Sequence, residues 1–370
     1  MTPLHGCQVV SLAEQYPGPF ATLLLSDLGA DVVQVERPEG GDPARAFPGH
    51  FAALARGKRS VALDLKSDAG RSACRALVDR ADVLLEGFRP GVLARLGLDP
   101  AELTGTNPGL VVVSVSGFGR TGPRRDQPAH DLTFQALAGL LDPASPAMPG
   151  LALADLAAGL FATVAALTGL AGRATGGQGG HYDVAMLDAV MALAMTRLVP
   201  AANGMAPDRL GDDPGYGLFA TADGGWVSLS IAFEDRFWRD LCTAAGLPDL
   251  ADVPGADRVA RREELRGRLA GRFAEHDLAH WRTVLDGVPC TAVVRGPDEV
   301  LADPQIDARG LLAPVGGQRF LSQPLVVDGE RPGPRRGVPG LGEHTAEVLG
   351  EAGVDADTLA AVLAGLPARY

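Results

Sequence analysis

The stretch QVVSLAEQYPGPFATLLLSDLGADVVQV, residues 8–35, joins two β-branched runs through one apolar segment. The runs are Gln8 to Leu12 and Asp31 to Val35, and both have the composition of buried strands. Pro19 stands where the first turn of a helix tolerates a residue without an N–H, so we predict a helix from Pro19 to Leu28. A strand, a helix and a second strand in this order predict two parallel strands with a helix packed on them.

The same alternation continues toward the middle of the chain. Further strands are predicted at Ser60 to Leu63, Asp82 to Leu85 and Leu110 to Val115, and Ser67 is placed to cap a helix from Asp68 to about Arg80. The first part of the chain is therefore predicted to be an α/β domain built on a doubly wound, Rossmann-like parallel sheet.

A second, smaller α+β domain is predicted after a loop rich in Gly, Pro and Asp, Ala201 to Pro214. A hairpin from Tyr216 to Ile231, three helical patterns ending near Asp286 and a strand at Thr291 to Val294 would form it. A Pro-, Gly- and Arg-rich stretch then leads into a helical tail that could rejoin the first domain. The predicted boundaries are residues 1–200 for the large domain, 201–215 for a linker, 216–312 for the small domain, 313–340 for a second linker and 341–370 for the C-terminal helices.

Composition narrows the class of protein. Of 370 residues, 46% are apolar and 21% charged, which indicates a folded globular chain of about two domains. The net charge of −12 argues against a general nucleic-acid or anionic-membrane surface, because such surfaces require many cations. The four cysteines, Cys7, Cys74, Cys242 and Cys290, are widely spaced and indicate neither a zinc site nor a disulfide framework. With no secretory pattern at the N-terminus, we expect a cytoplasmic protein without a metal cofactor.

Two patterns allow other interpretations. Leu151 to Leu170 is long and apolar enough to span a membrane, but it is rich in Ala and Gly and carries Asp155, so a buried helix is favoured. The segment Gly117 to Gly122 matches G-x-G-x-x-G after a strand, as in nicotinamide-dependent oxidoreductases. That alternative requires a helix starting at Gly122, whereas Pro123 follows directly and Pro128 comes soon after.

Several strings together resemble the superfamily of family III CoA-transferases and α-methylacyl-CoA racemases. They are VVSLAEQYPGPFATLLLSDLGADVVQVERP from Val9, RGKRSVALDLKS from Arg56, EGFRPG from Glu86, VSVSGFGRTGP from Val113 and LGEHTAEVL from Leu341. The resemblance implies an enzyme acting on acyl-CoA thioesters. It also implies a large domain made from both chain ends, a small domain between them, and an interlocked homodimer with active sites between the large domain of one chain and the small domain of the other.

The coenzyme A site is expected among basic residues at strand ends and in adjoining loops, where open α/β sheets bind ligands. Guanidinium and ammonium groups suit phosphates, although a solvated basic face remains the alternative for each. The candidates by charge are Arg37, Arg56, Lys58, Arg59 and Arg89. The resemblance supports Arg37, Arg56 and Arg89 in particular, and adds Ala55, Leu84, Glu86 and Asp131.

The catalytic residues are inferred from the same resemblance. His130, in PAHD, matches the histidine of the racemases, and Asp155, in LADLAAG, matches the aspartate that both branches share. The segment IAFEDRFW places Glu234 where a racemase carries a glutamate that faces the histidine. The corresponding non-catalytic roles are a surface histidine, a helix N-cap for Asp155, and a helix-start carboxylate for Glu234.

Two reactions remain open at this point. As a racemase, the enzyme would use His130 and Asp155 as two bases that epimerise the α-carbon of a 2-methylacyl-CoA, and this is the favoured interpretation because His130 is present. As a transferase, it would use Asp155 to attack the thioester and form covalent intermediates. The sequence TFQA after His130-Asp131 is closer to the transferases. The acyl group is not specified by the sequence.

Overall fold

The computed structural model describes residues 2–206 and 210–367, which form two compact units. The first unit joins the chain up to Leu198 with the chain from Asp307 onward, and the second comprises Val199–Ile306. Residues 207–209 of the predicted first linker and 368–370 of the predicted C-terminal segment lie outside the described residues, as does Met1.

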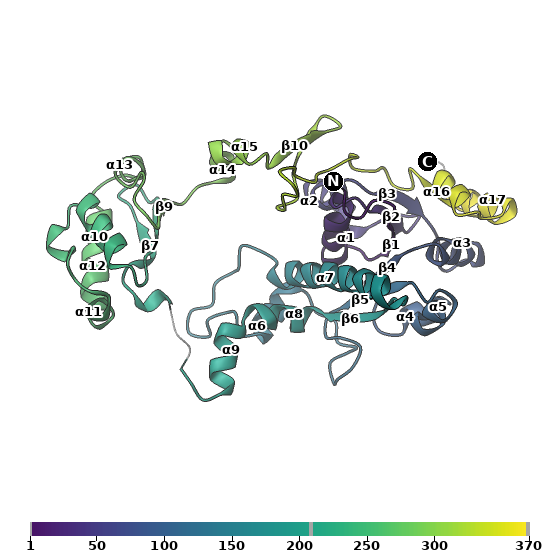
Figure 1. Cartoon of the computed structure of the whole chain (residues 1–370), viewed down its shortest axis with the longest axis horizontal. Coiled ribbons are helices and arrows are strands. Elements are labelled where there is room, and N and C mark those ends of the chain that lie inside the picture. The colour runs from purple at the N-terminus through teal and green to yellow at the C-terminus, as the bar shows by residue number, and fades with distance from the viewer. Residues whose placement is uncertain (1, 207–209, 368–370) are drawn as a thin grey trace. The chain divides into compact units, whose positions relative to one another are not determined.

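The first unit is built on a six-stranded sheet in which all strand pairs are parallel. The order is β3-β2-β1-β4-β5-β6, so the chain winds outward from β1 to one edge and then crosses to the other side (Figure 1). The strands are β1 Gln8–Leu12, β2 Asp31–Glu36, β3 Arg59–Ala62, β4 Val83–Glu86, β5 Val111–Ser116 and β6 Gly180–Ala185.

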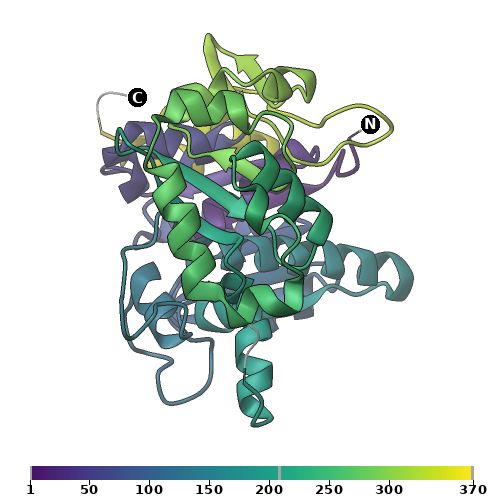
Figure 2. The same ribbon diagram turned by 90° about the vertical axis from the view of Figure 1, so that its left-hand side faces the viewer.

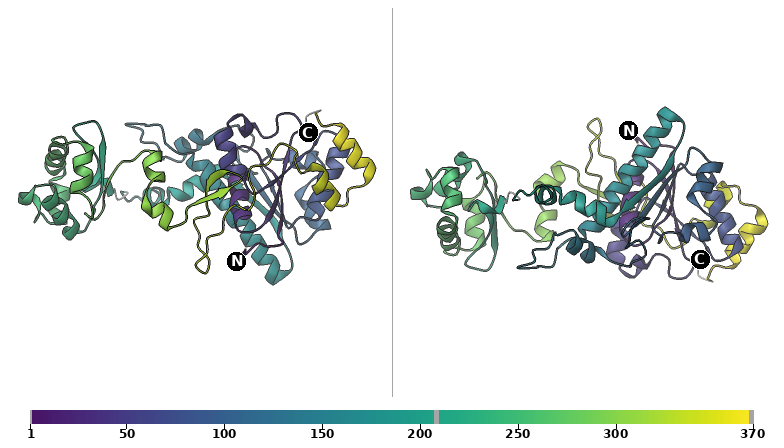
Figure 3. Two further views of the ribbon diagram at one scale, coloured as in Figure 1. Left: turned by 90° about the horizontal axis from the view of Figure 1, so that it is seen from above. Right: turned by 90° about the horizontal axis from the view of Figure 1, so that it is seen from below.

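Apolar side chains alternate between the two faces of this sheet, and each face is covered by helices. One face packs against α1 Pro17–Asp27, α7 Leu153–Gly176 and α8 Met186–Leu193. The other packs against α3 Asp68–Asp79, α4 Val92–Arg95, α5 Pro100–Thr106, α16 Thr345–Glu351 and α17 Ala356–Ala364. The two C-terminal helices, yellow in Figure 3, lie beside α3, so both chain ends contribute to one core.

The predicted strands of the first unit are confirmed within one residue, because runs of Val and Leu buried on both faces are readily recognised. Helix α3 is also confirmed, and the Ser67 hydroxyl accepts a hydrogen bond from Gly70 N–H as its N-cap. Helix α1 starts two residues before the predicted position, since Pro17 and not Pro19 occupies the first helical position.

Two elements of the first unit were not predicted. Strand β6 lies at the edge of the sheet, where His181 and Asp183 are exposed, so it lacks the continuous apolar run that marks a buried strand. The hairpin of β10 Leu312–Val315 and β11 Gln318–Leu321 lies largely within the predicted second linker, where Gly316 and Gly317 make the turn with positive φ.

The second unit contains a three-stranded antiparallel sheet, β7-β8-β9, with helices packed on it (Figure 2). Its core includes the fully buried Trp238, Trp281 and Phe273. The predicted hairpin and strand are confirmed, whereas the helical region has four α-helices instead of three. Its elements are β7 Tyr216–Ala220, β8 Trp226–Ser230, α10 Asp235–Ala244, η3 Pro248–Leu250, α11 Gly255–Ala260, α12 Arg262–Phe273, α13 Leu278–Val284, β9 Thr291–Val293 and α14 Pro297–Leu301.

Short elements complete the chain. They are η1 Pro43–Ala46, α2 Pro48–Ala55, α6 Asp131–Leu137, α9 Met195–Ala202, η2 Leu210–Asp212 and α15 Pro304–Ala308. Helix α7 is long and apolar enough to cross a membrane by length and composition, but half of its most apolar window is buried within the protein. Its contacts with α1, β5 and α8 are those of a core helix.

Candidate active site

The order of the strands places a crevice between β1 and β4. The connections from these two neighbours run in opposite directions across the sheet, and ligands of open α/β sheets bind at the carboxyl ends of such strands. A groove of about 600 Å³ lies at the carboxyl ends of β1 to β4. Arg37, Lys66 and Phe88 are among the residues that line it, so it presents two cations and an aromatic ring to a ligand.

Arg37 lines this groove and Arg89 directly follows the lining residue Phe88; both arginines are exposed. The Arg37 guanidinium is 60% exposed; it lies 3.3 Å from the Glu14 carboxylate and donates to Gly41 O. Arg89 follows β4 in the loop that also carries Phe88, and its side chain makes no hydrogen bond or ion pair within the described part of the chain. Both guanidiniums are therefore available to phosphate oxygens.

The predicted basic cluster is arranged differently. Arg56 is buried and forms an ion pair with Asp27, whose Oδ2 lies 2.8 Å from Nη2, and it also donates to Leu321 O. Arg59 is buried among Asp31, Glu347 and Glu351. Lys58 is buried and donates to Pro19 O at 2.9 Å. These three side chains are occupied by protein partners, so we remove them from the candidate coenzyme A site.

Three further residues that the resemblance suggested are also buried. Leu84 is in the core between β1 and β5, and Ala55 lies on α2 beside a small enclosed cavity. The Glu86 carboxylate, at the end of β4, accepts from Phe88 N–H at 2.8 Å and thereby shapes the loop that carries Arg89. Burial raises the pKa of Glu86. The side chains of Ala55 and Leu84 cannot reach a ligand, and Glu86 acts on the shape of the loop.

Asp155 lies in the first turn of α7. The cap of this helix is Asp131, whose Oδ1 accepts from Ala154 N–H at 2.7 Å and from Asp155 N–H at 3.4 Å. The other Asp131 oxygen accepts from Gln135 Nε2 at 2.6 Å. Asp155 is thus not the N-cap, and its carboxylate makes no hydrogen bond or ion pair with any residue that the structure describes.

The environment of Asp155 favours its neutral form. Burial, followed by the nearby Asp131 charge, raises the pKa of Asp155 from 3.8 to about 7. A helix N-terminus by itself favours an anion, so the loss of hydration outweighs the helix dipole here. The carboxyl group is therefore both weakly solvated and able to exchange its proton near neutral pH.

Tyr16, to which the sequence did not point, is the N-cap residue of α1. Its ring packs edge-on against His50, with 4.8 Å between the ring centroids, and its pKa is raised by burial and then by the Asp155 and Asp131 charges. Helices α1 and α7 are in close contact there, since a Cβ at Gly159 would lie 2.8 Å from Pro17 O. The glycine one turn after Asp155 was the available signal for this contact.

His130 and Glu234 belong to different units. His130 is the N-cap residue of α6, is exposed, and its ring makes no hydrogen bond with a described residue. Glu234 begins α10 in the second unit, where its carboxylate accepts from Phe233 N–H at 3.1 Å and Ala232 N–H at 3.3 Å. These bonds lower the pKa of Glu234. The pairing of Glu234 with His130 stays a prediction.

The glycine-rich turn does not bind a dinucleotide in the manner of an oxidoreductase. No helix begins at Gly122; the turn leads instead into a loop that ends at α6. Gly117 packs against the Phe134 ring, which a Cβ would approach to 2.9 Å, and its carbonyl accepts from Leu187 N–H. Across residues 2–206 and 210–367, no three His, Cys, Asp or Glu side chains are grouped as a possible metal site.

The sequence profile of CoA-transferase family III matches residues 4–345, almost the whole chain. The chain belongs to CoA-transferase family III. Among curated proteins, a succinyl-CoA:mesaconate CoA-transferase of Haloarcula hispanica is 36% identical, covering 97% of this chain and 98% of that protein. An acetyl-CoA:oxalate CoA-transferase of Acetobacter aceti is 34% identical, covering 94% of this chain and 95% of that protein.

Solved structures of the family III fold agree with this assignment. A CaiB/BaiF family protein from Brucella suis superposes with a TM-score of 0.84 at 32% identity, covering 95% of this chain and 99% of that one. The predicted superfamily and the predicted α/β class are therefore confirmed. The racemase branch is not specifically supported, because the relatives described here are named CoA-transferases.

Proposed function

We propose that this protein is a CoA-transferase in which Asp155 is the covalent nucleophile. The observation that carries the proposal is the Asp155 carboxylate, which is half-buried and has no hydrogen-bond partner among the described residues, in a chain of CoA-transferase family III. Such a carboxylate is more nucleophilic than one that is fully hydrated or paired.

The reaction follows from the chemistry of a carboxylate and a thioester. The Asp155 carboxylate attacks the thioester carbonyl, the C–S bond breaks, and a mixed anhydride and CoA thiolate form. The thiolate then attacks the Asp155 carbonyl, which releases the first acid as its carboxylate and leaves an aspartyl-CoA thioester. A second carboxylate attacks this thioester and the thiolate returns to the new acyl group, so that Asp155 is regenerated and no proton or electron is consumed overall.

The residues around Asp155 support this assignment. With a pKa of about 7, an appreciable part of Asp155 is ionised at neutral pH, and only the ionised form attacks. Asp131 holds the first turn of α7 by accepting hydrogen bonds from the Ala154 and Asp155 backbone N–H groups. We propose that the nucleotide end of CoA lies in the groove near Arg37, Lys66, Phe88 and Arg89.

The substrates, assembly and location are part of the proposal. The names of the relatives include succinate, mesaconate, oxalate and glutarate, all dicarboxylic acids, so we propose small dicarboxylic acids as CoA donor and acceptor. The homodimer expected from the resemblance, a cytoplasmic location, and independence of metals, membranes and nucleic acids are carried forward as proposals.

An isotope experiment tests the reaction directly. The protein is incubated with an acyl-CoA and an acceptor acid labelled with ¹⁸O in both carboxylate oxygens, and the peptide containing Asp155 is weighed by mass spectrometry. The proposed cycle transfers one labelled oxygen to Asp155. CoA transfer without this label would rule out Asp155 as the nucleophile.

The racemase interpretation is tested in parallel, without an acceptor acid. Deuterium incorporation at the α-carbon of a 2-methylacyl-CoA in heavy water, lost in both His130→Ala and Asp155→Ala, would establish two-base proton transfer. We expect no incorporation, and we expect His130→Ala to retain CoA transfer, because the transferase cycle requires no second base.

A further inference from the structure

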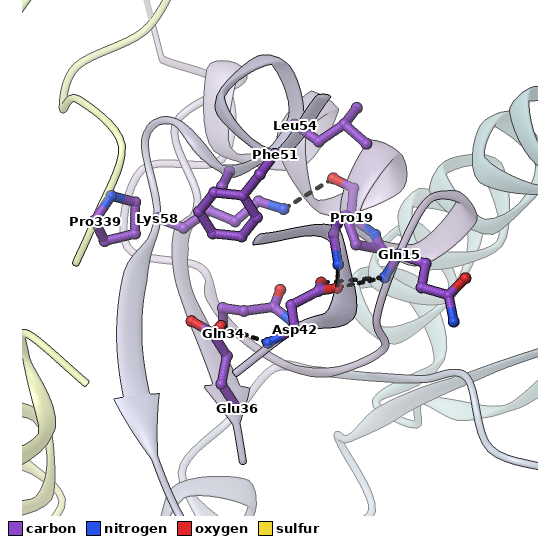
Figure 4. A pocket seen from close by; sticks show the side chains of 11 residues that line it. Gln15, Pro19, Gln34, Glu36, Asp42, Phe51, Leu54, Lys58 and Pro339 are labelled. Carbon is purple, nitrogen blue, oxygen red and sulfur yellow. Dashed lines mark hydrogen bonds between the residues drawn. The ribbon is translucent and has the colours of Figure 1, made fainter. Parts of the chain in front are cut away.

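Three buried polar side chains converge on the backbone of Ala13 to Pro19, here called the 13–19 segment. Gln34 Nε2 donates to Ala13 O at 2.6 Å, the Asp42 carboxylate accepts from Gln15 N–H at 3.0 and 3.1 Å, and Lys58 Nζ donates to Pro19 O at 2.9 Å. Each of the three side chains is at most 5% exposed. Figure 4 shows Lys58 directed at the Pro19 carbonyl and Asp42 at the backbone of Gln15.

The segment adopts a backbone conformation that requires such support. Gln15 has a φ of +69°, which non-glycine residues rarely adopt and which costs on the order of 1–3 kcal/mol. Both Asp42 oxygens hold its N–H, and Asp42 is itself fixed, since it accepts from Ala44 N–H and donates its own N–H to Glu36. The strained residue directly precedes Tyr16.

Lys58 is unusual for this chain, which contains two lysines and 31 arginines. Its neighbours Arg56 and Arg59 are paired with carboxylates, whereas the hydrogen bond of Lys58 goes to a backbone carbonyl. The cavity beside it measures about 10 Å³, room for roughly one water molecule and too small for a substrate. Lys58 therefore does not bind substrate, and the group on which it acts is the 13–19 segment.

This segment contacts the catalytic helix. Pro17 O would be 2.8 Å from a Cβ at Gly159, so any movement of the segment changes its packing on the turn that follows Asp155. Tyr16, in the middle of the segment, directly precedes Pro17 and packs its ring edge-on against His50. The packing of Pro17 on α7, and with it the position of Tyr16, thus depends on a backbone that buried side chains hold.

We propose that Lys58, Asp42 and Gln34 are positioning residues that hold the 13–19 segment, and with it Tyr16, against the first turns of α7, which carry Asp155. This inference rests on the proposed function for its effect on turnover. The hydrogen-bonded network itself is independent of which reaction the site performs.

The main test is Lys58→Met, which leaves no carbonyl unpaired because Thr22 Oγ1 also donates to Pro19 O. The groups that face the Lys58 amine are Asp42, Glu36, Asp27 and Arg56, and burial lowers its pKa to about 7. Since a buried ammonium is costly, the variant should melt at the same temperature as the wild type or higher. We expect kcat for CoA transfer to fall roughly 10- to 100-fold, as for a small misplacement of catalytic groups, with KM for the acyl-CoA changed less than about threefold.

Gln323→Met is the matched control. Gln323 is also buried, and it donates to Leu24 O near the opposite end of α1. This substitution removes a hydrogen bond to the same helix, but at a position distant from Tyr16. We therefore expect kcat to stay within about twofold of the wild type. If Gln323→Met lowered kcat as much as Lys58→Met, any loosening of α1 would be enough to slow the reaction, and the proposal would be overturned.

A double-mutant cycle of Lys58→Met with Tyr16→Phe tests whether Lys58 acts on turnover through Tyr16. If Lys58 acts through Tyr16, the double variant should be little slower than the more impaired single variant; independent, additive losses would contradict the proposal.

Hydrogen–deuterium exchange provides a readout that needs no activity. Exchange in residues 13–19 should rise in Lys58→Met while the core of the sheet stays protected, and unchanged exchange there would overturn the network. If the wild type transfers no CoA, the proposed function fails, and exchange still decides whether Lys58 holds the segment.

Discussion

Arg56 is a buried and Asp155 a half-buried ionisable group; Arg56 contacts the last residue of α1, and Asp155 precedes the turn of α7 that contacts the first, and the two groups differ in their partners. The Arg56 guanidinium has a carboxylate and a carbonyl as partners, and the Asp155 carboxylate has no partner among the described residues. A buried charge with partners keeps its charge and stabilises one arrangement of the chain. A buried charge without partners is driven toward neutrality and becomes reactive near pH 7.

The other basic residues of the Arg56 to Arg59 stretch have protein partners, as Arg56 does. Charge in the sequence suggested phosphate binding for Arg56, Lys58 and Arg59, but these residues fix the junction between α1, β3 and the C-terminal helices. Arg37 and Arg89, which carry the same charge at more exposed strand ends, are the cations that we propose for the ligand. Substitutions can separate charges that stabilise the fold from charges that serve the reaction.

The largest effect is expected for Asp155→Asn. Replacement of a covalent nucleophile should lower kcat by at least about 10⁴-fold. The same substitution should make the folded protein more stable at neutral and higher pH. Between pH 3.8 and about 7, wild-type Asp155 is protonated in the folded state and ionised in the unfolded chain. Wild-type stability therefore falls as pH rises through this range.

The check is thermal unfolding at several pH values. Asp155→Asn should melt above the wild type when the pH exceeds 7, and the difference should shrink as the pH approaches 3.8. A variant that melts below the wild type throughout would indicate that Asp155 has a stabilising partner.

Arg56→Met should show the reverse pattern. It leaves the buried Asp27 carboxylate without its main partner, so the free energy of unfolding should fall by about 3–5 kcal/mol, measured by urea denaturation. Molecules that remain folded should bind acyl-CoA with a KM near that of the wild type. A large rise in KM with unchanged stability would return Arg56 to the binding site.

Arg37→Met should affect binding more than stability. The side chain is 60% exposed and lies 3.3 Å from Glu14, so the free energy of unfolding should change by less than about 1 kcal/mol. Loss of one phosphate contact should raise KM for acyl-CoA about tenfold, or about 1.4 kcal/mol. Free CoA and dephospho-CoA, compared as competitive inhibitors, would show which phosphate is involved.

Asp131→Asn should give the smallest effect, a shift of the pH profile. An asparagine can still cap α7, but it removes the neighbouring charge that helps raise the pKa of Asp155. The rise of kcat/KM with pH, centred near 7 in the wild type, should move to lower pH. A shift to higher pH would mean that Asp131 favours the charged form of Asp155.

The local elements could be predicted because they depend on neighbouring residues. The Val-rich strands β1 to β5, the Ser67 cap and the hairpin of the second unit were all readable from short segments. Strand β6 was missed because an edge strand with His181 and Asp183 on its exposed face lacks the apolar run that marks a buried strand. Asp155 was identified from the resemblance, and its surroundings were not.

The sequence by itself determined the parallel sheet, the family and the position of the shared aspartate, because apolar periodicity and motif order are properties of the chain. Only the tertiary structure decided which charges would be paired. Arg56 meets Asp27, Asp131 meets the N-terminus of α7, and Pro17 meets Gly159 across distances in the chain that no local pattern spans. The energy of a charge depends on the atoms around it and on its access to water, and folding alone sets both.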